Sequence, residues 1–423
     1  MALSGGIDSA VSAWNLIQAG YEVEAAFMKN YSATKGLKYD ECPWLQDRQD
    51  ALRVAAFLGI PMHTVNFEKE YERNVLNYFF KEYKAGRTPN PDVMCNKEIK
   101  FKMLYDWAMK NGFDYMATGH YAQVMRLMDK SGTKSDTQRL KMAPVDNFKN
   151  EKMVGKWQSR KKASALRQSA KGDGTIDPSD LRLARSADEF KDQTYFIYNI
   201  RTPQLPHLLF PIGHLKKSQV KEIAKKIGLP NASKKESMGL CFVGKIRLKE
   251  FLDQKLKPRP GNIIDVTDRA GTKRNSRQVI GKHQGLAYYT IGQRQGVRVG
   301  AGGPWYVVGK DLKKNELLVT NNPEDGQLET KEVQLHSVNF ITTPLSLKQK
   351  NFGDANSANT KDAQPVKLLG RFRHQGDLVP LTISRIGRDR YTVKFNQPQQ
   401  AVASGQSLVL YDGQVCIGGG VIV

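Results

Sequence analysis

The sequence predicts an α/β fold in which a parallel, helix-covered sheet is followed by a small central domain and a C-terminal β-barrel. Strand and helix patterns alternate from the N-terminus to about Tyr121, as is typical of a parallel sheet with helices on its faces. Beyond about Lys282, short apolar segments alternate with turn residues, as in a small closed or nearly closed barrel. A chain of 423 residues is long enough for two or three domains that each bury a core.

The α/β part is predicted from apolar periodicity and from turn residues. A helix follows residue 6, with Val11, Trp14 and Ile17 on one face, and residues 86–91 form a turn-rich break further along. The further expected helices are residues 50–58, 68–84 and 97–110, and the expected strands are residues 21–28, 62–67 and 115–118. Ligands are expected at the carboxyl ends of these strands.

The rest of the chain is divided by two polar insertions. Residues 129–180 are rich in Lys, Arg, Ser and Gly without apolar periodicity, which predicts a disordered basic insertion. Residues 345–364 form the second insertion, and a basic helix is expected over residues 215–227. The later expected strands are residues 305–308, 316–320, 378–386, 391–395 and 407–411. The predicted domains are residues 1–205, 206–281 and 282–423.

Charge and cysteine usage narrow the function classes. Lys and Arg number 65 against 42 Asp and Glu, so the formal net charge of +23 favours a polyanionic partner such as a nucleic acid. A basic organelle or proteome is the alternative explanation. The four cysteines are too scattered for a disulfide scaffold and lack the spacing of a zinc site. No run approaches the about 18 apolar residues that a membrane-spanning helix needs.

The most informative motif is Ser4-Gly5-Gly6-Ile7-Asp8-Ser9, which leads from a short apolar stub into the first helix. Its glycines let a ligand approach the backbone, its serines add donors, and the helix N-terminus attracts anions. Because a carboxylate repels phosphate unless a divalent cation lies between them, Asp8 points to pyrophosphate with Mg²⁺. The alternative is a Ser/Gly turn that only caps the helix.

Only three residues, Met1 to Leu3, precede this motif where a full strand is expected. The first strand of a doubly wound sheet lies centrally, so its absence would leave both neighbouring strands with unpaired backbone groups. We therefore expect this chain to be an incomplete version of a longer one. The alternative is that the first strand is truly absent.

Two cysteines lie in contexts that suit reactive thiols. Asp92 and Cys95 lie three residues apart on a Pro-rigidified loop that enters a helix, where the helix dipole stabilises a thiolate. Asp92 could act as a general base or hold a substrate N–H. Cys241 lies between Gly239 and Gly244 among lysines, whose charge lowers a thiol pKa. The alternatives are an inert buried cysteine beside a capping Asp, and a tight turn with a small apolar residue.

Together these segments resemble the tRNA-specific 2-thiouridylase family. The resemblance covers nearly the whole chain outside the two insertions. Residues 236–245 and 257–261 are most similar to the mitochondrial branch of the family. The matching segments are residues 4–9, 27–30, 90–101, 117–122, 191–196, 210–213, 241–244 and 289–294.

The resemblance implies a sheet of the adenine-nucleotide pyrophosphatase-loop type and an ATP-dependent sulfur transfer to the wobble uridine of tRNA. ATP would adenylate the C2 oxygen, a persulfide on Cys241 would deliver sulfur, and Cys95 would be the nucleophile that forms the resulting disulfide, with Asp92 as acid or base. Asp8 would hold Mg²⁺. The implied ATP-binding residues are Ser4, Gly5, Gly6, Ile7, Asp8, Ser9, Met28 and Gly119. The implied tRNA contacts are Asn90, Pro91 and Asp92 to the target base, and His120, Lys191, Asp192, Gln193, Arg371, Phe372 and Gln406 elsewhere.

The family also implies partners and a location. The expected substrates are the tRNAs for Lys, Glu and Gln, with sulfur from a cysteine desulfurase or a relay protein and with no membrane partner. The expected location is the mitochondrial matrix, with a bacterial-type cytoplasmic location as the alternative. Two rival functions remain: another adenylating synthetase with the same loop, and a tRNA-binding fragment that lost ATP turnover with its first strand.

Overall fold

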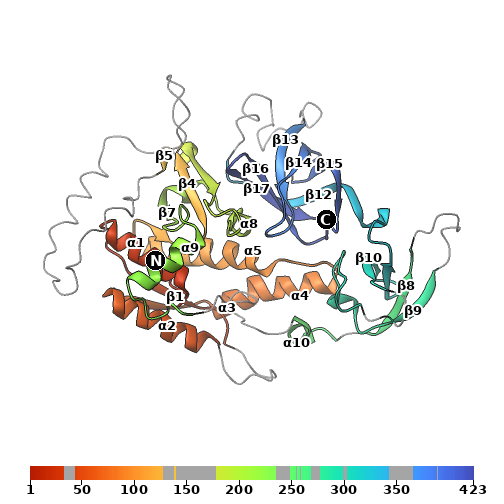
Figure 1. Ribbon diagram of the computed structural model, residues 1–423, viewed down its shortest axis with the longest axis horizontal. Helices are drawn as coiled ribbons and strands as arrows, with labels where there is room; N and C mark the ends of the chain where they lie inside the picture. The colour runs from red at the N-terminus through yellow and green to blue at the C-terminus, as the bar shows by residue number, and fades with distance from the viewer. Residues whose placement is uncertain are drawn as a thin grey trace.

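The computed structural model describes residues 1–32, 43–126, 138–139, 178–234, 248–253, 255–257, 259–267, 277–297, 299, 303–342, 365–387 and 389–423. An α/β part, a small four-stranded sheet and a barrel lie side by side. Two long helices, which contain the segments labelled α4 and α5, run from the first part toward the other two (Figure 1). The predicted fold class is confirmed: the α/β part contains parallel pairs, and the barrel closes through six strands.

The α/β part contains two parallel strand pairs. Strand β1 (Ala25–Lys29) pairs with β2 (Met62–Asn66), and β3 (Met116–Ala117) pairs with β7 (Leu208–Leu209). The spatial order is β2, β1, residues 1–3, β3 and β7, because residues 1–3 hydrogen-bond to both β1 and β3. Residues 1–3 therefore take the central place in the sheet, and the phosphate loop that follows them lies at its carboxyl edge.

The three residues before the loop take the place of the expected first strand. The N–H of Leu3 donates to the Ala26 carbonyl at 3.0 Å, and the N–H of Ala26 donates to the Met1 carbonyl at 2.8 Å. On the other side, the N–H of Ala2 donates to the Ala117 carbonyl at 2.8 Å. The unpaired edges that the sequence predicts beside a missing strand therefore do not occur at these positions.

Two long helices dominate the α/β part. The segments α3 (Glu68–Tyr71), η1 (Glu72–Leu76) and α4 (Asn77–Lys84) form one continuous helix, as predicted. The second helix consists of α5 (Pro91–Cys95), η2 (Asn96–Leu104) and α6 (Tyr105–Lys110), and it begins six residues earlier than predicted. Both η1 and η2 are π-helical, and a π-helical turn inside an α-helix often marks a functional site.

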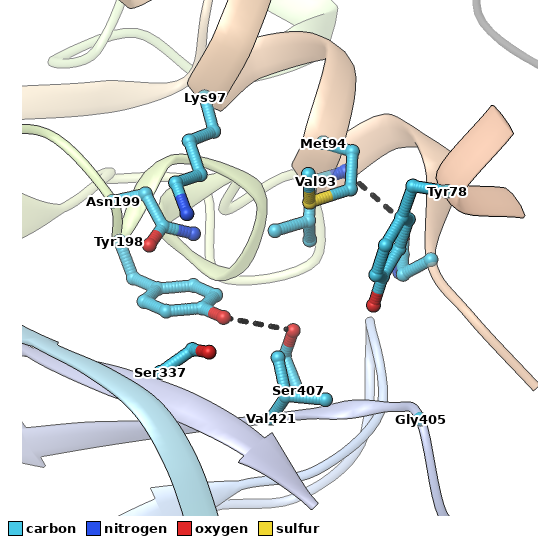
Figure 2. Close-up of a pocket in the computed structure, with 11 residues that line it drawn as sticks. Tyr78, Val93, Met94, Lys97, Tyr198, Asn199, Ser337, Gly405, Ser407 and Val421 are labelled. Carbon is cyan, nitrogen blue, oxygen red and sulfur yellow. Dashed lines mark hydrogen bonds between the residues drawn. The ribbon is translucent and has the colours of Figure 1, made fainter. Parts of the chain in front are cut away.

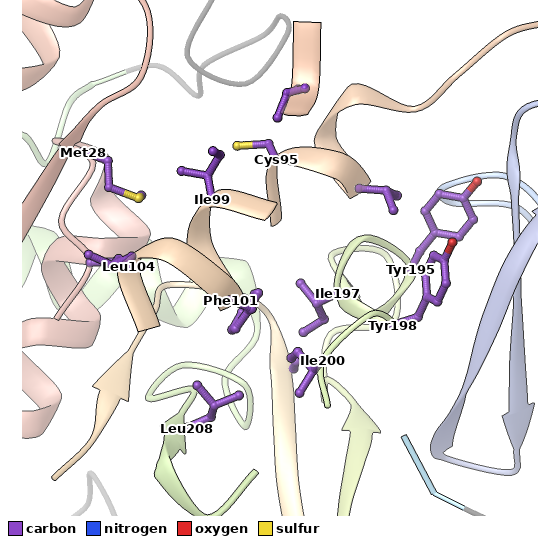
Figure 3. Packing of buried hydrophobic residues seen from close by; sticks show 14 of the residues in the cluster. Met28, Cys95, Ile99, Phe101, Leu104, Tyr195, Ile197, Tyr198, Ile200 and Leu208 are labelled. Carbon is purple, nitrogen blue, oxygen red and sulfur yellow. The ribbon is translucent and has the colours of Figure 1, made fainter. Parts of the chain in front are cut away.

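The two long helices share one apolar core with the end of β1. Figure 3 shows Cys95 among Met28, Ile99 and Leu104, with Tyr195 and Tyr198 at the barrel side of the same cluster. The flanking helices are α1 (Ile7–Gln18), α2 (Pro43–Leu58) and α9 (Lys217–Lys226).

A β-hairpin links the α/β part to the barrel. Strand β4 (Ala122–Arg126) pairs antiparallel with β6 (Leu181–Arg185) and with β5 (Gln138–Arg139). Strand β6 meets the barrel where Ala184 pairs with Val415 of β17. The predicted insertion at residues 129–180 enters between β4 and β6, and most of it lies outside the described residues.

The barrel is closed by pairing of its first and last strands, β12 and β17. Its order is β12, β15, β14, β13, β16 and β17. The predicted strands at residues 378–386, 391–395 and 407–411 correspond to β14, β15 and β16. Residues 345–364 lie outside the described residues. The strands are β12 (Glu329–Phe340), β13 (Val366–Arg371), β14 (Val379–Arg385), β15 (Tyr391–Gln400), β16 (Ser407–Asp412) and β17 (Val415–Ile422).

The domain boundaries differ from the prediction at two places. Strands β10 (Tyr306–Asp311) and β11 (Glu316–Thr320), expected in the barrel, join β8 (Gly261–Asp265) and β9 (Gln278–His283) in a separate sheet, because β11 pairs in parallel with β8. Strand β7 and helix α9, expected in the central domain, belong to the α/β part, because β7 pairs with β3 and α9 packs on α1. The remaining elements are η4 (Pro178–Asp180), α8 (Thr194–Ile197), η5 (Thr202–His207), α10 (Leu248–Asp253), η6 (Leu286–Tyr288) and η7 (Gly326–Leu328).

Within the ranges given above, every helix is too short or too polar to cross a membrane.

A buried ion pair joins the α/β part to the barrel. The Asp192 carboxylate is fully buried and accepts a hydrogen bond from Nη1 of Arg371 at 2.9 Å and one from Oγ1 of Thr194 at 2.9 Å. A second guanidinium, that of Arg185, lies 3.7 Å from the same carboxylate. Because Asp192 follows β6 and Arg371 ends β13, the pair fixes the barrel against the hairpin.

Replacing Arg371 by Met should leave the Asp192 carboxylate buried without its closest cation. Removing one partner of a buried pair costs about 3–5 kcal/mol, so we expect a loss of that order in the free energy of unfolding, measured by urea denaturation. The matched control is Arg373→Met on the same loop, where the side chain is exposed and the midpoint should change little. Equal midpoints for the two variants would show that the pair does not hold the joint.

Candidate active site

The phosphate loop is built around one left-handed glycine and two bonded serines. Gly5 has a φ of +75°, and a Cβ there would lie 2.5 Å from the Asp47 carbonyl oxygen, so only glycine fits. The hydroxyl groups of Ser4 and Ser9 lie 3.2 Å apart, and the Ser9 hydroxyl donates to the Gly6 carbonyl at 3.0 Å. These contacts hold the loop in one shape against α2.

Helix α1 begins directly after this loop without a side-chain cap. Its N-cap is Gly6, whose missing side chain leaves first-turn N–H groups for another acceptor. Gly119 packs on the same turn, because a Cβ there would lie 2.8 Å from the backbone nitrogen of Ser9. The uncapped helix end and the close backbone of residue 119 suit an anionic ligand. Ile7 is buried in the core and offers the ligand only its backbone.

Asp8 is held by a lysine that the sequence analysis did not single out. Both carboxylate oxygens accept hydrogen bonds from Nζ of Lys217, at 2.7 and 2.8 Å, and the hydroxyl of Tyr121 donates to one of them at 2.9 Å. The predicted helix at residues 215–227 contained Lys217, but nothing in the pattern indicated a partner 209 residues away. A Mg²⁺ ion at Asp8 would have to displace this ammonium group.

Within the described part of the chain, no group of three or more metal-ligating side chains comes together. Mg²⁺ commonly takes one or two protein carboxylates and completes its shell with phosphate oxygens and water. The single carboxylate of Asp8 fits such a mode only together with a phosphate ligand. Asp8 as a metal ligand therefore stays a prediction.

The segment after α9 covers the loop from outside. The amide nitrogen of Asn231 donates to the Gly5 carbonyl at 2.9 Å, and Nζ of Lys234 contacts Asp47 and Asp50 of α2 at 2.8 and 2.7 Å. These contacts with Lys234 lower the pKa of Asp50 and raise that of Lys234, although burial acts in the opposite direction on both. The chain thus reaches residue 234 directly beside the phosphate loop.

Cys241 itself lies outside the described residues. The described chain stops at Lys234, seven residues before Cys241, and resumes at α10, seven residues after it. Phe251 of α10 packs in the same core as Cys95, with its ring centroid 5.4 Å from that of Phe80. Both ends of the Cys241 segment are therefore anchored in the α/β part.

The loop before Cys95 is shaped by a helix cap. Oδ1 of Asn90 accepts hydrogen bonds from the N–H groups of Asp92 and Val93 at 3.1 and 3.2 Å, and Pro91 takes the first helical position. Cys95 follows in the second turn with its side chain fully buried. Asn90 thus has a structural role beside its predicted contact with the target base, and Asp92 stays half-buried at the helix start.

A pocket lies where this helix faces the barrel (Figure 2). Asn90, Val93, Met94 and Lys97 form one face of the helix at the pocket, since their spacing follows the helical repeat. Across the pocket, the hydroxyl groups of Tyr198 and Ser407 lie 3.1 Å apart. The further lining residues are Tyr78, Asn199, Ser337, Gly405 and Val421.

His120, a predicted tRNA contact, has a buried side chain, and its contact with tRNA stays a prediction. Its Nδ1 lies 2.8 Å from the Thr118 hydroxyl and its Nε2 lies 3.4 Å from Nζ of Lys100, so Nε2 must be the accepting nitrogen. Burial and, second, the Lys100 charge hold the pKa of His120 well below its usual value. The ring packs against Phe101 and Phe210 as a neutral core histidine.

Three further predicted tRNA contacts are also buried. The side chains of Asp192 and Arg371 are occupied by their ion pair, and Phe372 packs in the barrel core. These side chains therefore have structural roles in this conformation, and the predicted tRNA contacts of the three residues stay predictions. Sequence alone could not show the burial, because Lys191–Phe196 mixes charged and aromatic residues as surface segments also do.

Two predicted contacts are half-buried and already have hydrogen-bond partners. The side-chain carbonyl of Gln193 accepts from the N–H of Tyr121 at 2.9 Å, and the side-chain amide of Gln406 donates to the Thr88 carbonyl at 2.7 Å. Of the remaining predicted residues, Lys191 is half-buried, and Met28 lies in the Cys95 core rather than at the phosphate loop. Their predicted roles stay predictions.

Three family models match successive parts of the chain. The model described as tRNA methyl transferase HUP domain matches residues 1–162 and 165–245. The tRNA methyl transferase PRC-barrel domain matches residues 249–321, and the Aminomethyltransferase beta-barrel domain matches residues 345–422. These limits agree with the α/β part, the four-stranded sheet and the closed barrel.

Similar proteins carry one name, tRNA-specific 2-thiouridylase MnmA. The protein from Alkaliphilus oremlandii is 40% identical over 425 residues, which cover all of this chain and 96% of the relative. The protein from Lysinibacillus sphaericus is 38% identical over 423 residues, which cover all of this chain and 93% of the relative. The chain belongs to the tRNA-specific 2-thiouridylase family. These family members are bacterial, so they do not support the predicted mitochondrial location.

The buried His120 should make this 2-thiouridylase family member sensitive to acid. The unfolded chain binds a proton at His120 near the ordinary pKa, whereas the folded chain does not, so stability falls as pH drops below about 6.5. In His120→Gln the fall between pH 7 and 5 should be shallower by up to about 1.4 kcal/mol per pH unit, measured by urea denaturation. His207→Gln, at an exposed histidine, should keep the original slope; identical slopes for all three proteins would exclude His120 as the cause.

Proposed function

We propose that this chain is an ATP-dependent sulfurtransferase that converts the wobble uridine of tRNA to 2-thiouridine. The observation that carries the proposal is the full-length similarity to proteins named tRNA-specific 2-thiouridylase, combined with an uncapped helix end beside the phosphate loop. The net charge of +23 supports a nucleic-acid substrate.

The phosphate loop supplies the proposed ATP site. First-turn N–H groups of α1 would bind phosphate oxygens, and Gly5 and Gly119 would let them approach. Lys217 would turn from Asp8 toward the phosphates when ATP arrives, which would release the carboxylate for Mg²⁺. In this exchange Lys217 would move from one anionic group to another, and Mg²⁺ would replace it beside Asp8.

Two thiols and one carboxylate supply the proposed chemistry. The adenylyl group of ATP is transferred to the C2 oxygen of uridine and pyrophosphate leaves. The terminal sulfur of a Cys241 persulfide then attacks C2, the C2–O bond breaks, and AMP leaves with that oxygen. The Cys95 thiolate attacks the inner sulfur of Cys241 and releases the delivered sulfur as 2-thiouridine. The product is a Cys95–Cys241 disulfide, which an external thiol must reduce. Asp92, half-buried beside the helix start, would move the proton.

The finer assignments rest on the family resemblance. We propose the tRNAs for Lys, Glu and Gln as substrates, and a cysteine desulfurase or a relay protein as sulfur donor. Location in the mitochondrial matrix also stays a prediction.

Cys241→Ser should abolish 2-thiouridine formation while tRNA affinity stays within about threefold, because affinity comes from phosphate contacts. The matched control is Cys416→Ser, which changes a fully buried thiol in the barrel and should keep activity. The measurement is 2-thiouridine content by mass spectrometry, together with filter binding of tRNA. Thiolation by the Cys241→Ser protein would show that another group carries the sulfur.

Lys217→Met should lower the rate of AMP release at least about tenfold, because the phosphate site loses a buried ammonium group. Lys216→Met, at the exposed neighbouring lysine, should release AMP at the original rate. The same assay separates the rival functions. AMP release that does not depend on tRNA would indicate another adenylating synthetase, and no AMP release by the unaltered chain would indicate a binding protein.

A further inference from the structure

The most exposed large apolar side chain among those described is Phe190, with 83% of its surface open to solvent. It lies in the turn between β6 and α8, directly before the predicted tRNA-contacting residues 191–193. Nothing in the proposed reaction uses this side chain. A single exposed ring is not by itself a sign of a binding site, and what surrounds Phe190 decides whether it is one.

The surroundings of Phe190 are polar and cationic. The side-chain amide of Gln375 donates to the Phe190 carbonyl at 3.4 Å, which brings the turn after β13 beside it. Arg373 of that turn is exposed, and its guanidinium lies 5.0 Å from the ring centroid of Phe372. The His374 ring packs on Phe196 at 4.4 Å between centroids. The Phe190 surface is defined here as Phe190, Lys191, Arg373, His374 and Gln375.

The buried ion pair of Asp192 and Arg371 holds together the two turns that carry this surface. Phe190 stands two residues before Asp192, and Arg373 stands two residues after Arg371, so the buried ion pair fixes both turns. A surface that is already ordered loses little conformational entropy when it binds. Two exposed carboxylates are close in sequence to these turns, those of Glu189 and Asp377, and that of Glu189 lies 3.6 Å from the guanidinium of Arg185.

The helix that follows Phe190 in the chain contacts the loop of Asn90. This helix, α8, packs on α5, and the hydroxyl of Tyr195 interacts with the side chain of Asn90. The same hydroxyl donates to the barrel at the Ser407 carbonyl at 3.2 Å. A ligand at Phe190 would therefore lie on the side of the molecule where α8 packs against the helix that begins with Asn90 and Asp92.

We propose that Phe190 stacks on an unpaired base of the tRNA substrate while Arg373 contacts a neighbouring phosphate. This proposal rests on the proposed function. An exposed ring on a turn that is hydrogen-bonded to the turn of Arg373 matches the way proteins hold single-stranded RNA, in which bases stack on aromatic rings and phosphates meet basic groups. A protein partner would instead require a contiguous apolar centre, and the ring has polar neighbours.

Three substitutions of Phe190 separate stacking from apolar contact. Phe190→Leu keeps the apolar character without the π face and should weaken tRNA binding about tenfold at fixed salt. Phe190→Ala should weaken it at least as much, and Phe190→Trp should bind within about twofold of the original. The matched control is Phe57→Leu on α2, another exposed phenylalanine, which should change nothing. Thermal unfolding of each variant checks that the fold is intact.

Two further readouts do not depend on activity. The fluorescence of the introduced indole in the Phe190→Trp protein, measured as the difference from the unaltered chain, should be quenched by tRNA and not by heparin, because only a base can stack on the ring. The salt slope should stay unchanged in Phe190→Leu, and Arg373→Met should lower it by roughly 0.7–0.9.

Several outcomes would overturn the proposal. Phe190→Leu binding tRNA as tightly as the original protein would exclude stacking. Unchanged tRNA binding, combined with slower sulfur transfer from a donor protein but not from sulfide, would make this surface a protein-docking site. If the unaltered chain bound no tRNA, the proposed function itself would fail, and this result is distinct from a loss confined to the Phe190 variants.

Discussion

The buried carboxylate of Asp192 is hydrogen-bonded to a guanidinium, a hydroxyl and backbone N–H groups instead of water. The arrangement of the barrel against the α/β part depends on these bonds. The ion pair is surrounded by Thr194 and Tyr411, whose hydroxyl groups lie 3.1 Å apart. Such a network is favourable only when its geometry is complete, because each charge is otherwise buried without compensation. The pocket below α5 and the turn at Phe190 both lie at this joint, so their shapes depend on it.

The loop before Cys95 is held from all three parts of the molecule. Lys310 of the central sheet donates to the Gly86 carbonyl at 2.9 Å, and burial lowers the pKa of this lysine to about 8. The barrel contributes the hydrogen bond from Gln406 to Thr88, and within the α/β part Glu82 accepts from the Arg87 guanidinium at 2.8 Å. Because this loop leads directly into α5, the Cys95 thiol in that helix keeps its position, and the movement that sulfur transfer needs would fall to Cys241.

Sequence patterns predicted the helices and strands that depend on local periodicity. They did not predict the contacts between segments that are distant in sequence. The helix at residues 68–84 and the strand at residues 316–320 were predicted to the residue, because their apolar spacing and end signals are local. Strand β7 was missed, whereas β3, which also has only two residues, was predicted within residues 115–118. The burial of His120 and Asp192 and the contact of Lys217 with Asp8 follow from tertiary packing. The phosphate loop was found because its glycines and serines are contiguous.

The joint between hairpin and barrel also sets an order of events during synthesis. Asp192 leaves the ribosome 179 residues before Arg371, which at usual elongation rates is a delay of roughly 10–35 s. During this interval the edge of β6 has no β17 to pair with, and the carboxylate has no guanidinium from the barrel. The nascent α/β part must therefore stay soluble with an exposed strand edge, and a chaperone that shields such edges would raise the yield of folded protein.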